Sequence, residues 1–204
     1  EVSCGDICVV SGIKDITICD TICDPEYPVQ MSTIKIEEPT MSMNFMVNSS
    51  PFAGREGKFV TTRHIRDRLD KELEVNVGLL VEETDSTDAF RVSGRGELHL
   101  SVLIEQMRRE GFELTVGKPR VVTKVIDGVV NEPMERLTVD IPEQYLGAVT
   151  QLLAARKGQL QSMVNHGTGW VRLEFRVPAR GLIGFRTKFL TETHGTGIQS
   201  SIGD

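Results

Sequence analysis

Apolar residues recur along the first half of the chain with spacings that predict an order of strands and helices. Between Met41 and Val47 every second residue is apolar and suited to a core (Met41, Met43, Phe45 and Val47). This is the two-residue period of a strand with one buried face. Around residues 65–73 and 97–110 the apolar positions recur about once per helical turn, which predicts two amphipathic helices. Further strands are expected at residues 77–81, 90–93 and 112–116. This order is that of a ferredoxin-like βαββαβ domain, an antiparallel sheet with both helices on one face.

The second half of the chain repeats the same order with little residue identity between the copies. The expected elements are a strand at 137–141, a helix from Pro142 to about Gly158, strands at 160–164 and 170–177, a helix at 181–190 and a short strand at 198–202. The predicted fold class is therefore α+β, with two ferredoxin-like βαββαβ domains in tandem.

The residues before the first repeat have a different pattern. Isoleucine and valine stand between glycine and aspartate up to about residue 33, which favours short strands at the end of a β-barrel. Two prolines between Pro25 and Gln30 indicate a linker. All four cysteines lie in this region, at Cys4, Cys8, Cys19 and Cys23. Small buried core residues are the favoured interpretation of these cysteines, with a zinc site and disulfides as the alternatives.

The overall composition is ordinary for a globular protein, with 39% apolar and 25% charged residues among 204. No apolar run has the length of a membrane span and no basic-then-apolar leader opens the chain, so a cytoplasmic protein without membrane contact is expected. The net charge of −6 argues against a uniformly basic nucleic-acid binder. It leaves room for a local basic face.

One local excess of positive charge stands out between Trp170 and Leu190. The basic residues there are Arg172, Arg176, Arg180, Arg186 and Lys188, against the single acidic Glu174. Basic side chains placed in this way suit RNA phosphates, which bind by charge without base recognition. These five residues are the predicted RNA-binding residues. The glycines of "ARGLIG" (Ala179–Gly184) would let the backbone approach a ligand closely. The competing interpretation is a merely solvated sheet face.

Other candidate chemistry is weak. The stretch "AGREGKF" (Ala53–Phe59) resembles a phosphate-binding loop, but Phe52 stands where the motif requires its first glycine and Phe59 where it requires a hydroxyl. The histidines are scattered, and the acidic run at residues 82–88 has no partner base. No catalytic, cofactor-binding or metal-ligating residue is therefore expected in this chain.

Long motifs point to a family. The stretch "VSGRGELHLSVLIEQMRREGFEL" (Val92–Leu114) resembles the third domain of elongation-factor-G-like translational GTPases. "MSMNFMVNSSPFAGREGKFVTTRHIRDRL", "VEETDSTDAFRVSGRGELHL" and "VRLEFRVPARGLIGFRTKFLT" resemble more closely the TypA/BipA family of ribosome-associated GTPases. The resemblance covers nearly the whole chain.

The resemblance implies a modular layout. Residues 1–33 correspond to the end of the β-barrel second domain, residues 34–118 to the third domain, and residues 119–204 to the equivalent of the fifth domain. The GTP-binding domain of the family precedes these parts, so GTP and Mg²⁺ are expected there. This chain itself is expected to be no enzyme and to carry no cofactor.

The partners that the resemblance implies are the ribosome, through rRNA near its GTPase-associated centre, and the GTPase domain of the parent protein. The chain would dock on rRNA and relay the state of that domain. The alternative function is a tandem ferredoxin-like regulatory module that binds a small ligand.

Overall fold

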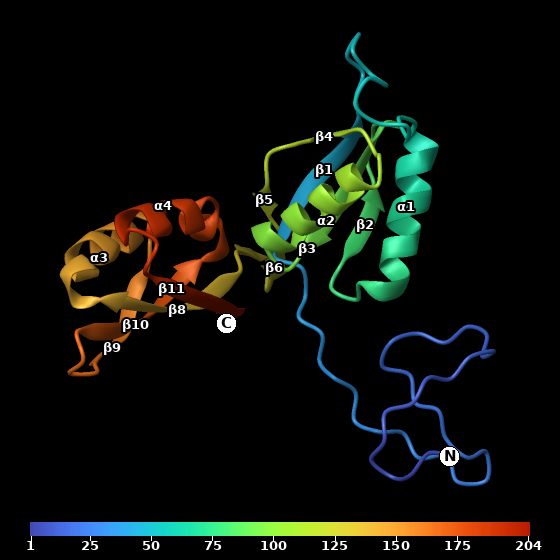
Figure 1. Ribbon diagram of the computed structural model, residues 1–204, viewed down its shortest axis with the longest axis horizontal. Helices are drawn as coiled ribbons and strands as arrows, with labels where there is room; N and C mark the ends of the chain where they lie inside the picture. Colours follow the sequence, from blue (N-terminus) through green and yellow to red (C-terminus); the bar gives the residue numbers. More distant parts are fainter.

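The computed structural model describes residues 1–204 and contains two α/β units, each with its own sheet and core (Figure 1). In the first unit the elements follow the predicted order: β1 (Met41–Val47), α1 (Thr62–Val75), β2 (Leu80–Glu83), β3 (Ala89–Gly94), α2 (Glu97–Arg109) and β4 (Leu114–Val116). The strands pair antiparallel in the order β2-β3-β1-β4, and β5 (Arg120–Val121) also pairs with β1. The predicted ferredoxin-like arrangement is confirmed.

The core of the first unit lies between the sheet and its two helices. Phe45 from β1 meets Ile65 and Leu69 from α1, and all three side chains are completely buried. Leu100 and Met107 from α2 complete the contact and are equally buried. The alternation along β1 and the helical spacing in α1 therefore direct apolar groups to one place, as the sequence predicted.

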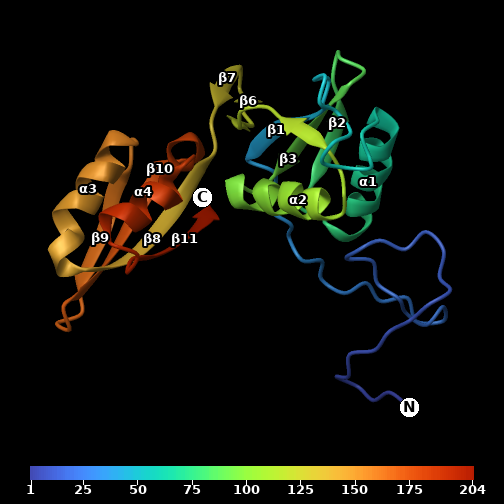
Figure 2. The same ribbon diagram turned by 45° about the horizontal axis from the view of Figure 1, so that its top comes forward.

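The second unit repeats this topology. Its elements are β8 (Met134–Pro142), η1 (Glu143–Tyr145), α3 (Leu146–Ala155), β9 (Gln159–Asn165), β10 (Trp170–Pro178), η2 (Ala179–Leu182), α4 (Phe185–Glu192) and β11 (Ile198–Gly203). The strands pair antiparallel in the order β11-β8-β10-β9. Figure 2 shows α3 and α4 on the same side of this sheet, where Val149 and Phe189 are buried against Leu173 and Phe175 of β10. The opposite face of the sheet carries no helix.

The last helix of this unit begins later than the sequence predicted. We expected a helix over residues 181–190, but η2 ends at Leu182 and α4 begins only at Phe185. Gly184 lies between them with φ of 67°, a left-handed conformation that a continuous α-helix does not contain.

A short hairpin between the two units was not predicted. The strands β6 (Lys124–Ile126) and β7 (Val129–Asn131) pair antiparallel around Asp127 and Gly128. These two residues have φ of 50° and 76°, the positive values that a two-residue primed turn requires. The dipeptide Asp-Gly between apolar residues is the signal that would have found it.

Residues 1–40 form neither helix nor strand, and Figure 1 shows them trailing away from the first unit. The short strands expected in residues 1–33 are thus not formed. A barrel strand is stable only when a neighbouring strand satisfies its backbone groups, and this segment finds no such partner here. Assignment of this segment to the end of a barrel domain stays a prediction.

The cysteines of this segment do not lie in a core. Cys4, Cys8 and Cys23 are exposed and Cys19 is partly exposed, so the interpretation as buried core residues is wrong in this structure. None of the four forms a disulfide. None of the helices is long and apolar enough to cross a membrane.

Candidate nucleic-acid interface

Two of the predicted RNA-binding residues lie on the face of the second sheet that carries no helix. We call this face, which bears Arg172 and Arg176, the open face. Along β10 the side chains of Val171, Leu173 and Phe175 are buried against the helices, so Arg172 and Arg176 point to the opposite face. Their exposed fractions are 49% and 50%. The predicted face alternation of this strand is confirmed.

Each of these two arginines has a carboxylate beside it on the same face. Arg172 donates from Nε and Nη2 to the two carboxylate oxygens of Asp140, at 2.8 Å in both cases. The register of the sheet explains this pair, because Arg172 stands directly opposite Asp140 of β8. The hydrogen bonds from Arg172 lower the pKa of Asp140 below its ordinary value.

A second carboxylate serves two arginines. Asp204 accepts from Arg176 Nε at 2.6 Å and from Arg136 Nη2 at 3.3 Å. Arg136 stands opposite Arg176 in the register of β8 and β10, so the carboxylate separates two like charges. The hydrogen bond from Arg176 is the main cause of the lowered pKa of Asp204.

The other three predicted residues lie elsewhere. Arg180 lies in η2 beyond the end of β10 and donates from Nε to Glu132 at 2.6 Å. Arg186 and Lys188 lie on α4, in the helical layer that covers the opposite face of the sheet, and both are exposed. The fold therefore divides the five residues among the open face, the end of the sheet and the helical layer, and does not gather them into one patch.

The ion pairs of the open face are of the weak, exchangeable kind. Their arginines are about half exposed, and solvent and salt screen pairs at such positions. The two non-bridging oxygens of a phosphate group offer a guanidinium group the same bidentate geometry as a carboxylate does. Asp140 and Asp204 therefore occupy positions that RNA phosphates could take.

The loop that resembles a phosphate-binding motif holds a carboxylate of the protein itself. Glu113 is buried to 8% exposure, and its Oε2 accepts the backbone N–H groups of Gly54 at 2.9 Å and Gly57 at 3.3 Å. Its Oε1 accepts from Asn48 Nδ2 at 2.6 Å. Burial alone would raise the pKa of Glu113, but these hydrogen bonds outweigh it and lower the pKa. The residues present thus do not fit a nucleotide phosphate, because the anion position is already filled.

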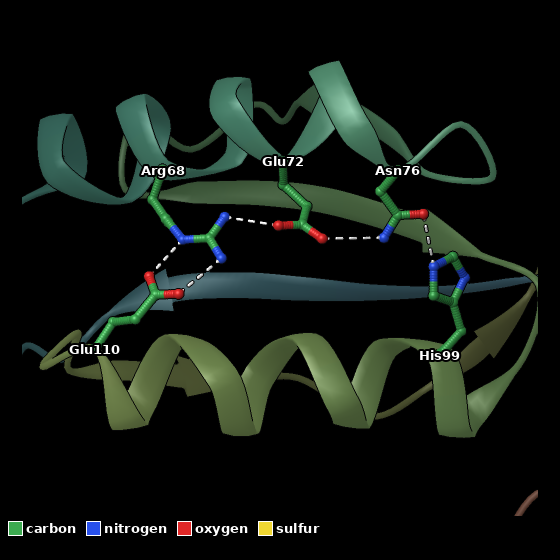
Figure 3. A network of polar contacts seen from close by, with 5 residues as sticks. All are labelled: Arg68, Glu72, Asn76, His99 and Glu110. Atoms are coloured by element: carbon green, nitrogen blue, oxygen red, sulfur yellow. Dashed lines mark hydrogen bonds and ion pairs between the residues drawn. The ribbon is translucent and has the colours of Figure 1, made fainter. Parts of the chain in front are cut away.

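A polar network fills the space between α1 and α2, which lie side by side on one face of the first sheet (Figure 3). Arg68 of α1 donates from Nε and Nη2 to Glu110, at 2.6 and 3.0 Å, and from Nη1 to Glu72 at 2.7 Å. Asn76 Nδ2 donates to the other oxygen of Glu72 at 3.2 Å, and Asn76 Oδ1 lies 2.9 Å from His99 Nε2. The local patterns of the sequence do not predict this network, because its hydrogen-bonded residues are up to 42 positions apart.

The hydrogen bonds of His99 define its protonation state. Its Nδ1 lies 3.1 Å from the backbone N–H of Arg95, so Nδ1 accepts and carries no proton. Nε2 must then carry the proton and donate to Asn76. Burial lowers the pKa of His99, the positive charge of Arg95 lowers it further, and Glu72 acts in the opposite direction.

Stability is expected to depend on pH through His99. The folded state favours neutral His99, so its contribution is fully present above the unfolded pKa of 6.5 and is lost as the pH falls through the lower folded value. We expect the unfolding free energy to decrease from about pH 7 to about pH 5. Urea unfolding should show a flatter pH dependence in His99→Gln than in wild type. His166→Gln, in an exposed turn, is the control and should keep the wild-type dependence.

Known proteins resemble this chain over most of its length. The family described as elongation factor G C-terminus matches residues 129–202, nearly the whole second unit. The large ribosomal subunit assembly factor BipA of Salmonella typhimurium is 57% identical over 194 residues, which are 95% of this chain and 32% of that protein. BipA of Bacillus subtilis is 54% identical over 198 residues, or 97% of this chain and 32% of the relative.

This chain belongs to the BipA family. It spans about a third of the length of the BipA proteins that it matches. A crystal structure of a protein from Thermus thermophilus resembles the fold with a TM-score of 0.52 and 14% identity, covering 89% of this chain and 43% of that one. This likeness concerns the fold alone. The family resemblance found in the motifs of the sequence is confirmed.

The structure explains why a glycine is needed at position 181 of the BipA-like motif "ARGLIG". A Cβ atom on Gly181 would lie 2.5 Å from the carbonyl oxygen of Arg156, closer than real side chains come. At Gly181 the backbone therefore approaches Arg156 of the same chain closely. The approach of a ligand to this motif stays a prediction.

Proposed function

We propose that this chain is the ribosome-binding part of a BipA-type translational GTPase and that it docks on ribosomal RNA. The observation that carries the proposal is the open sheet face with Arg172, Arg176 and Arg136, whose ion pairs are exposed enough for RNA phosphates to replace the carboxylates. The relatives are named large ribosomal subunit assembly factors, which supports a ribosomal partner in the cytoplasm.

In this proposal the chemistry of GTP belongs to a part of the parent protein outside this chain. GTP and Mg²⁺ would bind there, and the first unit would contact that part and relay its state to the second unit. The filled anion position at Glu113 supports this division, because the one phosphate-like loop in the chain is used for folding.

Removal of the open-face arginines is expected to weaken ribosome binding. Arg172→Ala with Arg176→Ala should reduce affinity and lower the salt dependence of binding by about two units of slope, one for each lost phosphate contact. Co-sedimentation of the chain with ribosomes at graded salt measures both quantities. Arg186→Ala with Lys188→Ala tests the helical layer in the same way. Asp140→Asn, which frees Arg172, should strengthen binding.

The matched control removes two basic residues from the first unit. Arg63 and Arg109 have exposed fractions of 89% and 79% and are not predicted to contact RNA, so Arg63→Ala with Arg109→Ala should bind almost as wild type does. If both test pairs keep the affinity and the salt slope of wild type, docking through these residues is excluded.

A further inference from the structure

The segment Arg180–Gly184 of the second unit lies against the first unit. It follows β10 and leads into α4, so the second unit holds both of its ends. Ile183 nevertheless packs on the buried core of the first unit and is itself partly buried. The segment is therefore a point at which the second unit makes an apolar contact with the core of the first.

A charged hydrogen bond accompanies this apolar contact. Oε2 of Glu97, the first residue of α2, accepts the backbone N–H of Gly184 at 2.8 Å across a separation of 87 residues. Gly184 is the N-cap of α4, so the N-termini of α2 and α4 both lie near this carboxylate. The partial positive charges of both helix ends stabilise a negative group there. The left-handed φ of 67° at Gly184 orients the N–H and disfavours any other residue.

The second unit holds the same segment rigidly from its other side. Arg156, at the end of α3, donates from Nη1 to the carbonyl oxygens of Gly181 at 2.7 Å and Ile183 at 2.8 Å. Its guanidinium group also lies 5.7 Å from the centre of the Phe185 ring. Arg156 therefore couples the segment to α3, because moving the segment alone would break these two hydrogen bonds. A displacement of Glu97 would therefore move the second unit as a whole.

Beside this contact the two units are separated by an open cleft. The cleft has a volume of about 780 Å³, with Arg95 and His99 of the first unit and Glu135 and Arg186 of the second among its lining residues. This space allows the units to change their relative angle if the contact at Glu97 opens.

We propose that Glu97 and the Arg180–Gly184 segment form a latch that fixes the orientation of the second unit relative to the first. With the latch closed, the open face with Arg172 and Arg176 has one defined orientation relative to the first unit. With the latch open, the units turn about the connector at residues 123–133, between β5 and β8. The suggestion that this latch is the path of the relay rests on the proposed function, whereas the latch itself does not.

Glu97→Ala tests the latch in the complete chain. It removes the acceptor and keeps a good helix former at the start of α2. Nuclear magnetic resonance measures two consequences. Exchange of the Gly184 amide proton should be about tenfold faster or more, because its hydrogen bond is lost. Residual dipolar couplings of the two units should no longer fit a single relative orientation. Amide exchange within β1 and β10 should stay as in wild type, which shows that both units remain folded.

Two further variants complete the test. Glu105→Ala is the matched control, because Glu105 lies on the exposed side of the same helix with a 59% exposed side chain, and it should change neither measurement. Ile183→Ser removes the apolar contact and should release the orientation as Glu97→Ala does. A Gly184 amide that exchanges at the wild-type rate in Glu97→Ala, or a single orientation retained in both test variants, would overturn the proposal. Loss of ribosome binding plays no part in these measurements, so the latch and the proposed function fail or succeed separately.

Discussion

Arg68→Ala is expected to lower the unfolding free energy of the first unit by about 2–3 kcal/mol. The Arg68 side chain is only 12% exposed and makes three charge-assisted hydrogen bonds to Glu72 and Glu110. Glu72 is 13% exposed, so it would be left as a mostly buried carboxylate that has lost its cation. The hydrogen bonds from Arg68 are also the main cause of the lowered pKa of Glu110.

Urea unfolding followed by two probes measures this effect. Far-ultraviolet circular dichroism reports on both units, whereas fluorescence of Trp170, the single tryptophan, reports on the second. Arg68→Ala should shift the unfolding of the first unit, which circular dichroism detects. The transition measured by Trp170 fluorescence should stay as in wild type. Arg63→Ala, on the exposed face of the same helix, should change stability by less than about 0.5 kcal/mol. Equal effects of the two substitutions would show that the network in Figure 3 contributes no more than a surface pair.

Gly181→Ala is expected to destabilise the second unit by about 2–3 kcal/mol. The added Cβ would lie 2.5 Å from the carbonyl oxygen of Arg156 and 3.2 Å from Cγ1 of Val177. The first of these neighbours is backbone and cannot turn away as a flexible side chain can. The segment after β10 must then shift, and the hydrogen bonds from Arg156 to Gly181 and Ile183 weaken with it.

Trp170 fluorescence during urea unfolding reports this effect directly, because Trp170 belongs to β10 of the same sheet. Gly147→Ala provides the control of identical chemistry. Gly147 is the second residue of α3, and no atom lies within 4 Å of the position its Cβ would take. That substitution should leave the unit at least as stable as wild type, since alanine favours the helix. A Gly181→Ala protein as stable as Gly147→Ala would contradict the close contact.

The two ferredoxin-like units follow from local patterns in the amino-acid sequence. The alternation along β1 and β10 and the apolar stripe of α1 are local periodicities. Each of these elements buries one face, so its own sequence shows the period that predicts it. The family could also be recognised from the sequence, because its motifs are long and continuous. The hairpin of β6 and β7 has a local signal as well, in Asp127 and Gly128 of its turn.

The distribution of the charged residues, in contrast, depends on how the whole chain folds. The strand period shows that Arg172 and Arg176 share a face, but it cannot show that Asp140 and Asp204 stand beside them or that Arg186 lies in the other layer. The Glu97 contact to Gly184 and the Arg68 network join segments far apart in the chain. Such contacts depend on strand register and on the packing of whole elements, and neither quantity is encoded in the spacing of residues along one element.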